Sequence, residues 1–295
     1  MEIVHYPVLH KEVLEYLDLS SQSAPVLIDA TTGEGGHSAL FLEKYPSLTV
    51  YGLDRDSEIQ KKAIKRFECY GNRFRPINTW FDEFLRNAES SFADAILFDL
   101  GISMFHYVES QRGFSFSRDE KLDMRLDLNQ KLSAYDIVNY YSEEDLADVI
   151  YRYGEERYSR RISSAICLER KRGKIESCAE LASLIARSVP KEYRYGKINP
   201  ATRTFQALRI ETNKELDRIS PSLEEGIRVL KSGGRIAVIT FHSLEDRIVK
   251  WFFKNREKEV GDIRILTKKP VVPTKEEDDE NAASRSSKLR VIEKC

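Results

Sequence analysis

The chain has 295 residues, of which 41% are hydrophobic and 32% charged, and its formal net charge is −1. This length is enough for one large core or two smaller ones, and the near-neutral charge excludes a global positive field, so any nucleic-acid binding must come from local basic clusters. No apolar run approaches the ~20 residues that span a bilayer, and the charged stretch 1–17 is typical of an amphipathic helix rather than a signal peptide. The four cysteines are scattered without a C-x-x-C pair, so we expect no disulfide framework, no metal site and a cytoplasmic location.

Short apolar runs bounded by turn residues predict five buried strands, at 26–30, 48–54, 73–79, 93–100 and 234–241. Helical patterns separate the early runs, for example 57–71, which ends at a glycine. This alternation predicts βαβ units and a parallel sheet that is covered on both faces. Two late runs, 262–268 and 288–294, are expected to extend the sheet as an antiparallel edge.

The interval between the fourth and fifth strands holds about 130 residues, far more than the dozen or so that a crossover needs. Helical patterns fill it at 142–154, 160–173, 177–189 and 201–219, and a helix at about 221–231 returns the chain to the sheet. Ser142 with Asp145, and Ser177 with Glu180, have the spacing of helix capping pairs. We therefore predict an α/β fold with a Rossmann-like sheet, formed by 1–104 and 218–295, and an inserted helical domain at 105–217. The acidic and then Ser/Arg-rich segment 274–288 is predicted to be a mobile loop.

The stretch "LIDATTGEGGHS" (27–38) has the form of a nucleotide-binding turn after the first strand. Its glycines Gly33, Gly35 and Gly36 let the backbone turn tightly and approach a ligand. A dinucleotide fingerprint would require glycine at position 38, where this chain has Ser38. The turn therefore does not match a dinucleotide site.

Acidic residues follow three of the predicted strands: Asp29, Asp54 and Asp99. Ligands of open α/β sheets bind beyond the carboxyl ends of the strands, and Asp54 follows Gly33 by 21 positions, close to the ~20 expected for a carboxylate that binds ribose hydroxyls. S-adenosylmethionine has no pyrophosphate; it needs acids and backbone groups for its amino-acid end and its ribose, and an apolar wall, which Phe81 offers, for adenine. These residue types favour a site for that cofactor.

Each of these residues also has an ordinary structural explanation. Asp29 could cap the turn, Asp54 could be a surface acid, His37 could touch only its own helix start, and Phe81 could belong to the core. Asp99 is the hardest to explain in this way, because an acid after "AILF" is buried without a partner unless it faces a cleft.

The chain resembles the MraW/RsmH family of S-adenosylmethionine-dependent methyltransferases, which modify N4 of a cytosine in the decoding region of 16S ribosomal RNA. The resemblance runs from His5 to Val291 and rests on these motifs, in order: "HYPVL", "DATTGEGGHS", "FDLGIS", "RGFSFS", "LDMRLD", "YGEERYSRRI", "PATRTFQALRIETNKEL", "GGRIAVITFHSLEDRIVKWFF", "KKPVVPT" and "SRSSKLRV". It implies a class I methyltransferase sheet with an inserted helical domain. It also implies a set of cofactor contacts, supported by Asp29 and Gly33: Gly35, Gly36, His37, Asp54, Phe81 and Asp99.

Two of the implied contacts depart from the family pattern or have a rival. Phe84 is an alternative to Phe81 within "TWFDEF". His106 stands in the segment where the family usually carries a glutamine that touches the cofactor.

Asp99 is our candidate for the catalytic contact. The exocyclic amine of cytosine is a poor nucleophile, and an acceptor aimed at its N–H would orient the lone pair on the methyl group. Asp99 takes the place where amino-methyltransferases carry an Asp/Asn-Pro-Pro-aromatic motif, which this chain lacks. A carbon methyltransferase would need a cysteine nucleophile, and none of the four cysteines lies in a strand-end motif.

The inserted region carries aromatic and basic residues suited to an unstacked RNA base and its phosphates. The substrate candidates are Phe114, Phe116, Arg160, Arg161, Arg203, Arg209 and, after the fifth strand, His242. Each aromatic residue could instead be core, and Arg160 and Arg161 could lie on a solvated helix face.

Three interpretations of the whole chain remain. The first is a methyltransferase of 16S ribosomal RNA, with a small-subunit particle as partner; the second acts on another RNA, a protein or a small molecule. The third is a ribosome-assembly factor without catalysis, which the presence of all three acids disfavours. The sequence leaves open whether free RNA or an assembled particle is the substrate, and whether the protein is a homodimer.

Overall fold

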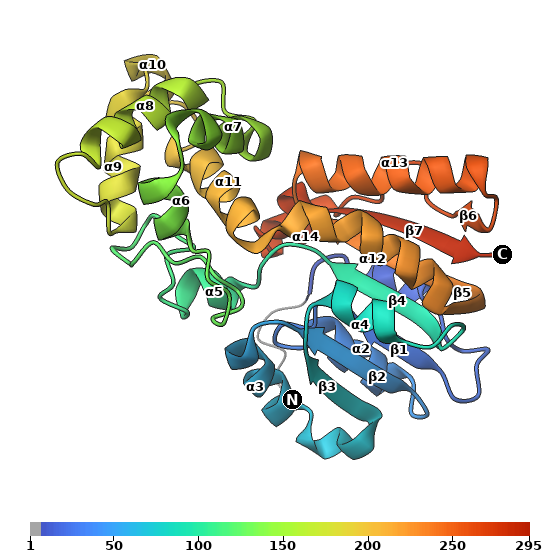
Figure 1. Ribbon diagram of the computed structural model, residues 1–295. Helices are drawn as coiled ribbons and strands as arrows, with labels where there is room; N and C mark the ends of the chain where they lie inside the picture. The colour runs from blue at the N-terminus through green and yellow to red at the C-terminus, as the bar shows by residue number, and fades with distance from the viewer. Residues whose placement is uncertain (1–6) are drawn as a thin grey trace. The chain divides into compact units, whose positions relative to one another are not determined.

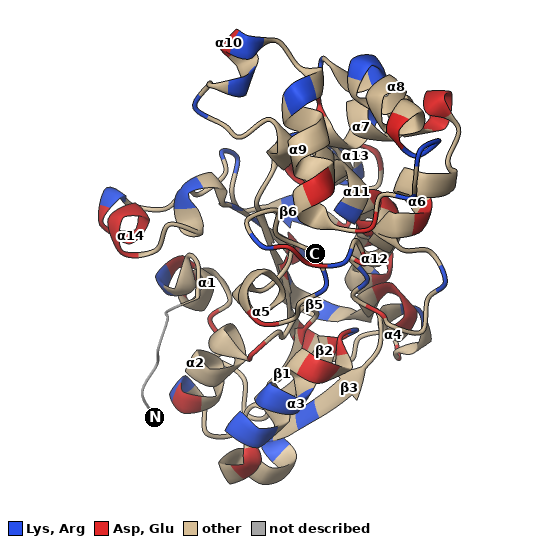
Figure 2. Ribbon diagram, turned by 90° about the vertical axis from the view of Figure 1, so that its left-hand side faces the viewer, with Lys and Arg blue, Asp and Glu red and all other residues tan. Residues whose placement is uncertain are grey.

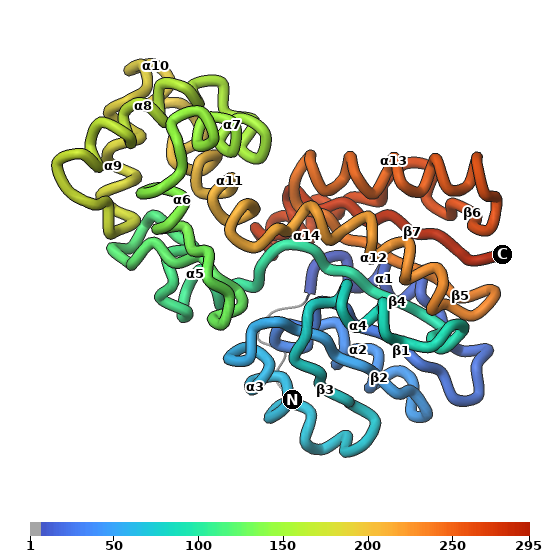
Figure 3. Tube along the Cα trace, viewed as in Figure 1, coloured from blue at the N-terminus to red at the C-terminus, as the bar shows by residue number. Residues whose placement is uncertain are grey.

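The computed structural model describes residues 7–295, and its chain divides into two compact units (Figure 1). Unit 1 holds the residues up to Gly101 and those from Leu216 onward, and unit 2 holds Ile102–Glu215. The tube in Figure 3 follows the chain out of unit 1 after the fourth strand and back into it through α12 (Glu215–Val229). The inserted segment was expected at 105–217. The motif that begins at His5 falls partly outside the described residues.

Unit 1 contains a mixed sheet with the strand order β3-β2-β1-β4-β5-β7-β6. The strands are β1 Val26–Asp29, β2 Thr49–Asp54, β3 Phe74–Asn78, β4 Ala93–Asp99, β5 Leu230–Thr240, β6 Ile263–Ile265 and β7 Lys288–Lys294. The first five pair in parallel, as predicted, and β7 runs antiparallel to both β5 and β6. Both late runs extend the sheet as its antiparallel edge, as expected: β7 lies next to β5, consistent with its buried central residues, and β6 is the outermost strand.

Successive residues of each central strand point to opposite faces of this sheet. Leu27 and Leu97 enter the core under α1 (His10–Tyr16) and α2 (Gly36–Lys44), whereas Ile28 and Phe98 enter the core under α4 (Phe81–Asn87), α12 and α13 (Ser243–Glu259). The remaining helices of this unit are α3 Ser57–Arg66, η1 Glu68–Arg73, α14 Lys275–Glu280 and η2 Ser284–Ser286. A sheet with a core on each face and five parallel strands confirms the predicted α/β fold.

Unit 2 is helical and has a core of its own. Its helices are α5 Met104–Val108, α6 Ala134–Tyr140, α7 Glu143–Gly154, α8 Ser159–Glu169, α9 Cys178–Ser188, α10 Lys191–Arg194 and α11 Ala201–Asn213. Both predicted capping pairs are present, because the Ser142 and Ser177 side chains accept hydrogen bonds from the amides of Asp145 and Glu180.

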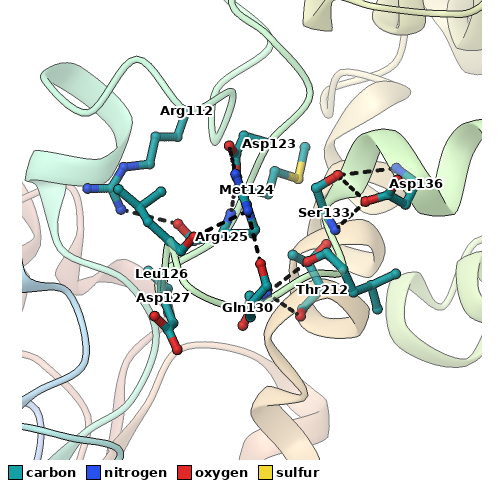
Figure 4. Close-up of polar contacts among 12 residues, drawn as sticks. Arg112, Asp123, Met124, Arg125, Leu126, Asp127, Gln130, Ser133, Asp136 and Thr212 are labelled. Atoms are coloured by element: carbon teal, nitrogen blue, oxygen red, sulfur yellow. Dashed lines mark hydrogen bonds and ion pairs between the residues drawn. The ribbon is translucent and has the colours of Figure 1, made fainter.

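The expected single helix at 201–219 is wrong, because α11 ends at Asn213 and Lys214 adopts a left-handed φ of 52°. The Asn213 amide group donates to the Met124 carbonyl (2.8 Å) and accepts from the Leu126 N–H (2.9 Å). Figure 4 shows the neighbouring polar contacts, including the one from Gln130 to the Thr212 carbonyl (2.9 Å). The end of α11 therefore holds an irregular segment of unit 2 in place, and the helix pattern cannot continue through it.

The segment 274–288, expected to be a loop, forms α14 and η2. Its Glu277 carboxylate accepts a hydrogen bond of 2.6 Å from the Leu9 amide, at the start of α1. Within residues 7–295, no helix is both long and apolar enough to cross a bilayer.

Candidate active site

Three acids end three adjacent strands of unit 1. Asp29, Asp54 and Asp99 are the last residues of β1, β2 and β4, and these strands are neighbours in the order β2-β1-β4. The parallel pairing places all three at the carboxyl edge, where ligands of open α/β sheets bind. The structure thus brings these predicted residues to one edge.

The glycine turn between β1 and α2 is shaped around this edge. Gly35 has a φ of +84°, and a Cβ at this position would lie 2.3 Å from the ring of Phe67, so no side chain fits. Asp54 fixes the turn from the next strand: its carboxylate accepts from the Gly33 amide (2.9 Å) and from the Asp56 amide (2.8 Å). The backbone of the turn is therefore held open beside the strand ends.

Asp29 is buried beneath the turn and bonded within the protein. Its carboxylate accepts a hydrogen bond of 2.6 Å from the Ser38 hydroxyl and one of 3.4 Å from the Thr31 amide. Burial raises the pKa of Asp29 to about 6, although the bond from Ser38 opposes this effect. Ser38, which departs from the dinucleotide pattern, thus serves as the partner of a buried acid.

His37 connects the turn to Asp99. Its Nε2 lies 3.0 Å from the Val8 carbonyl oxygen and its Nδ1 lies 3.5 Å from Asp99 Oδ2. A carbonyl can only accept, so Nε2 carries the proton of the neutral ring and Nδ1 presents a lone pair to Asp99. Burial lowers the pKa of His37 to about 4, which favours this neutral form. The alternative that His37 touches only its own helix start is not what the structure shows.

Asp99 has one carboxylate oxygen that no residue in the range 7–295 uses. Its side chain is 25% exposed, its Oδ2 faces His37, and its Oδ1 is buried without a hydrogen-bond partner among these residues. Its amide donates to the Thr31 hydroxyl (2.7 Å), which fixes the end of β4. Burial, and then the negative charges of Asp29 and Glu245, raise the pKa of Asp99 to about 8.

These features fit a cationic nucleoside ligand. S-adenosylmethionine carries a positive sulfonium and a positive amino group, and a nearby cation favours the ionised form of a buried acid. Gly35 carries no side chain that would block a ligand. Asp54 follows Gly33 by 21 positions, the spacing typical of a carboxylate that binds ribose hydroxyls. Asp99 Oδ1 has no hydrogen-bond partner among the described residues. No group of three or more acids, histidines and cysteines able to hold a metal occurs in the described part of the chain.

The two aromatic candidates at α4 lie at the edge of the core. Phe81 is the first residue of α4, is half-buried, and meets Phe98 edge-on with the ring centroids 5.6 Å apart. Phe84 lies one turn later, with its ring centroid 6.1 Å from that of Tyr51. Both therefore make core contacts, which the structural alternative expected for Phe81.

His242 caps α13. Its side chain accepts from the Glu245 amide (3.4 Å), and the Glu245 carboxylate accepts from the amides of Phe241 (2.8 Å) and His242 (3.3 Å). Glu245 was not among the predicted site residues, although it is buried and contributes to the raised pKa of Asp99. The H-x-x-E spacing could have identified this reciprocal cap, but histidine in place of serine or threonine obscures it.

The remaining predicted residues lie in unit 2. His106 is buried in α5, with ring centroids 5.4 Å and 5.2 Å from Phe105 and Phe114, and Phe116 meets Phe205 at 5.3 Å. Arg209 makes a bidentate ion pair with Glu215, at 3.0 and 2.9 Å. On α8, in contrast, Arg160 and Arg161 are exposed.

Comparisons with known proteins identify the family. Residues 2–295 match the model of the MraW methylase family. The ribosomal RNA small subunit methyltransferase H of Treponema denticola is 50% identical over 310 residues, which cover 100% of this chain and 98% of that protein. The proteins of the same name from Sulfurihydrogenibium sp. and Persephonella marina are 49% and 46% identical, over 98% and 99% of this chain and the same shares of their own lengths. A solved rRNA methylase from Streptococcus thermophilus is 14% identical with a TM-score of 0.39, covering 97% of this chain and 93% of that one, a likeness too weak to support a conclusion. The match over nearly every residue shows that the chain belongs to the MraW methylase family.

Proposed function

We propose that this protein is an S-adenosylmethionine-dependent methyltransferase that methylates N4 of a cytosine in 16S ribosomal RNA. The observation that carries the proposal is Asp99, a buried acid with an unused oxygen beside a glycine turn, in a chain of this family. The partner is the small-subunit RNA or particle, the location is the cytoplasm, and unit 2 serves as the substrate-recognition part. A second copy of the chain is a further partner that sedimentation would test.

The residues of unit 1 have distinct roles in binding the cofactor. Asp54 accepts the ribose hydroxyls while it holds the Gly33 amide, and Gly35, Gly36 and His37 line the path of the ligand. The half-buried ring of Phe81 covers the adenine. Asp29 supports the turn and does not bind the cofactor directly, because its carboxylate already accepts hydrogen bonds from Ser38 and Thr31. When bound, the cofactor supplies a methyl group on a sulfonium, which an amine attacks in line.

Asp99 orients the amine. Its Oδ1 accepts one N–H of the exocyclic group, which turns the nitrogen lone pair away from the ring and toward the methyl carbon. His37 Nδ1 lies 3.5 Å from the other oxygen, Oδ2, so Oδ1 is the oxygen that is available to the amine. This is a positioning contribution, and a hydrogen-bond partner fixed in a partly buried site is worth more than it is in bulk solvent.

The deciding experiment is methyl transfer from labelled S-adenosylmethionine to small-subunit RNA and to small-subunit particles, followed by mass mapping of the modified nucleotide. We expect label on N4 of a single cytosine, and much slower labelling with Asp99→Ala. Label on a ribosomal protein, on another base, or on no ribosomal substrate would refute the proposal.

A further inference from the structure

Unit 2 contains a pocket that has no assigned role in the proposed reaction. It has a volume of about 310 Å³, within the range of small-ligand sites, and is formed by the connection between α7 and α8, by α10 with the residues that flank it, and by α11. Its lining includes Arg157, Tyr158, Tyr193, Lys197 and Arg203. Figure 2 marks in blue the basic residues of α10 and of the segment that follows it. Of these lining residues, Arg203 was named as an RNA contact, and Arg157 begins the basic cluster "RYSRRI", which was expected to suit phosphates.

Arg157 packs against the rings of Tyr158 and Tyr193 at one wall of this pocket, and we call these three residues the Arg157 layer. Its guanidinium carbon lies 4.8 Å from the ring centroid of Tyr158 and 5.0 Å from that of Tyr193, and the two rings meet edge-on at 4.9 Å. Arg157 is exposed and makes no hydrogen bond to any residue that the structure describes. Its planar set of N–H donors is therefore held in place by the rings and remains available to a ligand.

A buried acid holds this layer rigid. Glu156 is fully buried, and its carboxylate accepts from the Tyr158 amide (2.8 Å) and from the Tyr193 hydroxyl. Burial and then this bond to Glu156 raise the pKa of Tyr193, which keeps the hydroxyl protonated as a donor. The aromatic faces are thus set before any ligand arrives, which reduces the entropy lost on binding.

The backbone around Arg203 is equally constrained. A Cβ at Gly154 would lie 2.5 Å from the Arg203 carbonyl oxygen, so α7 and α11 touch backbone to backbone at this point. Glu155 adopts a left-handed φ of 50°, and its carbonyl accepts from Arg203 Nη1 at 3.3 Å. A strained residue and a glycine contact therefore position the guanidinium of Arg203 at the pocket.

Three cations and one acid, Glu192, line the pocket, which favours an anionic ligand. An aromatic and guanidinium layer is a platform for a nucleobase, and the cations beside it, exposed Lys197 and half-buried Arg203, suit a phosphate. We propose that this pocket binds one unpaired nucleotide of the RNA substrate, with the base stacked on the Arg157 layer and the phosphate on Lys197 and Arg203. This inference rests on the proposed function, and it names a second RNA contact away from the reacting atoms.

The test uses the full-length protein and a short, fluorescein-labelled single-stranded RNA, with binding followed by anisotropy. Arg157→Ala should weaken binding about tenfold, because it removes a stacking surface and a cation. Lys197→Ala should lower the slope of log affinity against log salt by about 0.7, the value for one phosphate contact on a single strand. Arg157→Lys should keep the salt slope and lose part of the affinity.

Arg152→Ala is the matched control, because Arg152 is 71% exposed on α7 and outside the pocket. It should bind RNA as the parent does. An abasic strand should compete weakly, whereas equal competition by an abasic strand or by polyglutamate would overturn the stacking proposal. Parent-like affinity and salt slope in all the pocket variants would overturn the pocket itself.

These outcomes are separable from the proposed function. If the parent methylates small-subunit RNA but the pocket variants bind RNA normally, the function stands and the pocket assignment fails. If the variants lose RNA binding while the parent methylates no ribosomal RNA, the pocket stands and the reaction assignment fails.

Discussion

His37 and Asp99 form a neutral pair at the carboxyl end of β4, with His37 Nδ1 3.5 Å from Asp99 Oδ2. The pKa of His37 is lowered to about 4 and that of Asp99 is raised to about 8, in both cases chiefly by burial. At neutral pH and without a cationic ligand, the proton therefore resides on the carboxyl group, which points toward the lone pair of the imidazole. A cation in the site reverses this preference for Asp99, so its charge depends on the cofactor.

Replacing Asp99 tests the orienting role. Asp99→Ala removes the acceptor and should reduce kcat about 100-fold, in the range found when one positioned hydrogen-bonding group is lost at a reacting centre. Asp99→Asn keeps an acceptor oxygen and should retain more activity than the alanine variant. Turnover is measured with saturating RNA and cofactor, and full turnover of Asp99→Ala would exclude the role.

The raised pKa of Asp99 also predicts a pH dependence of stability. The folded protein holds this proton over a range where the unfolded chain has lost it, so the stabilisation is present at low pH and lost as pH rises through about 8. Asp29, with a pKa near 6, acts in the same direction at lower pH, whereas His37, with a lowered pKa, acts in the opposite direction below its ordinary value.

Asp99→Asn removes this titration. Without cofactor, the Tm of the variant should exceed that of the parent by a few degrees more at about pH 9 than at about pH 6, because two pH units of titration below pH 8 correspond to ~2.7 kcal/mol. Thermal denaturation at both pH values measures the difference. A constant difference in Tm would show that Asp99 does not titrate in this range.

The glycine turn can be tested with a pair of alanine variants. Gly35→Ala suffers a left-handed φ and a clash with Phe67, whereas Gly233→Ala has a φ of +77° and nothing within 4 Å of the new Cβ. Gly233→Ala should cost about 1 kcal/mol of stability, the strain of the backbone alone. Gly35→Ala should cost clearly more and also weaken cofactor binding. Equal denaturation midpoints would show that the ring moves aside freely.

Asp54 should control affinity for the cofactor. Asp54→Ala loses the acceptor of the Gly33 amide and the proposed partner of the ribose, so Kd for S-adenosylmethionine should rise at least tenfold. Calorimetric titration gives the value, and Glu144→Ala, an exposed acid on α7, is the control that should bind normally. If both variants bind alike, Asp54 has no part in the site.

Much of unit 1 was predictable from the sequence, because buried parallel strands such as β4 appear as short continuous apolar runs. The acids at the strand ends were predictable for the same reason, since each one interrupts such a run. The position of β7 between β5 and β6 was not predictable, because pairing partners leave no mark in a strand's own composition.

The contacts within the site were less accessible to sequence reasoning. Ser38 attracted notice only as a departure from a pattern, and its bond to Asp29 depends on how α2 packs over β1. The carbonyl of Val8, which selects the tautomer of His37, lies 29 positions from it along the chain. The break at Lys214 arises from Asn213 binding a distant segment, which helix periodicity does not encode.

Glu277, near the C-terminus, stabilises a segment near the N-terminus that contacts the site. Its carboxylate holds the amide of Leu9, 268 positions away, and the neighbouring Val8 carbonyl in turn holds the imidazole that faces Asp99. The acidic segment after β6 therefore helps to hold Asp99, at the end of β4, in position through Leu9, Val8 and His37. Cutting or excising that segment should loosen Asp99 without touching any residue of the site.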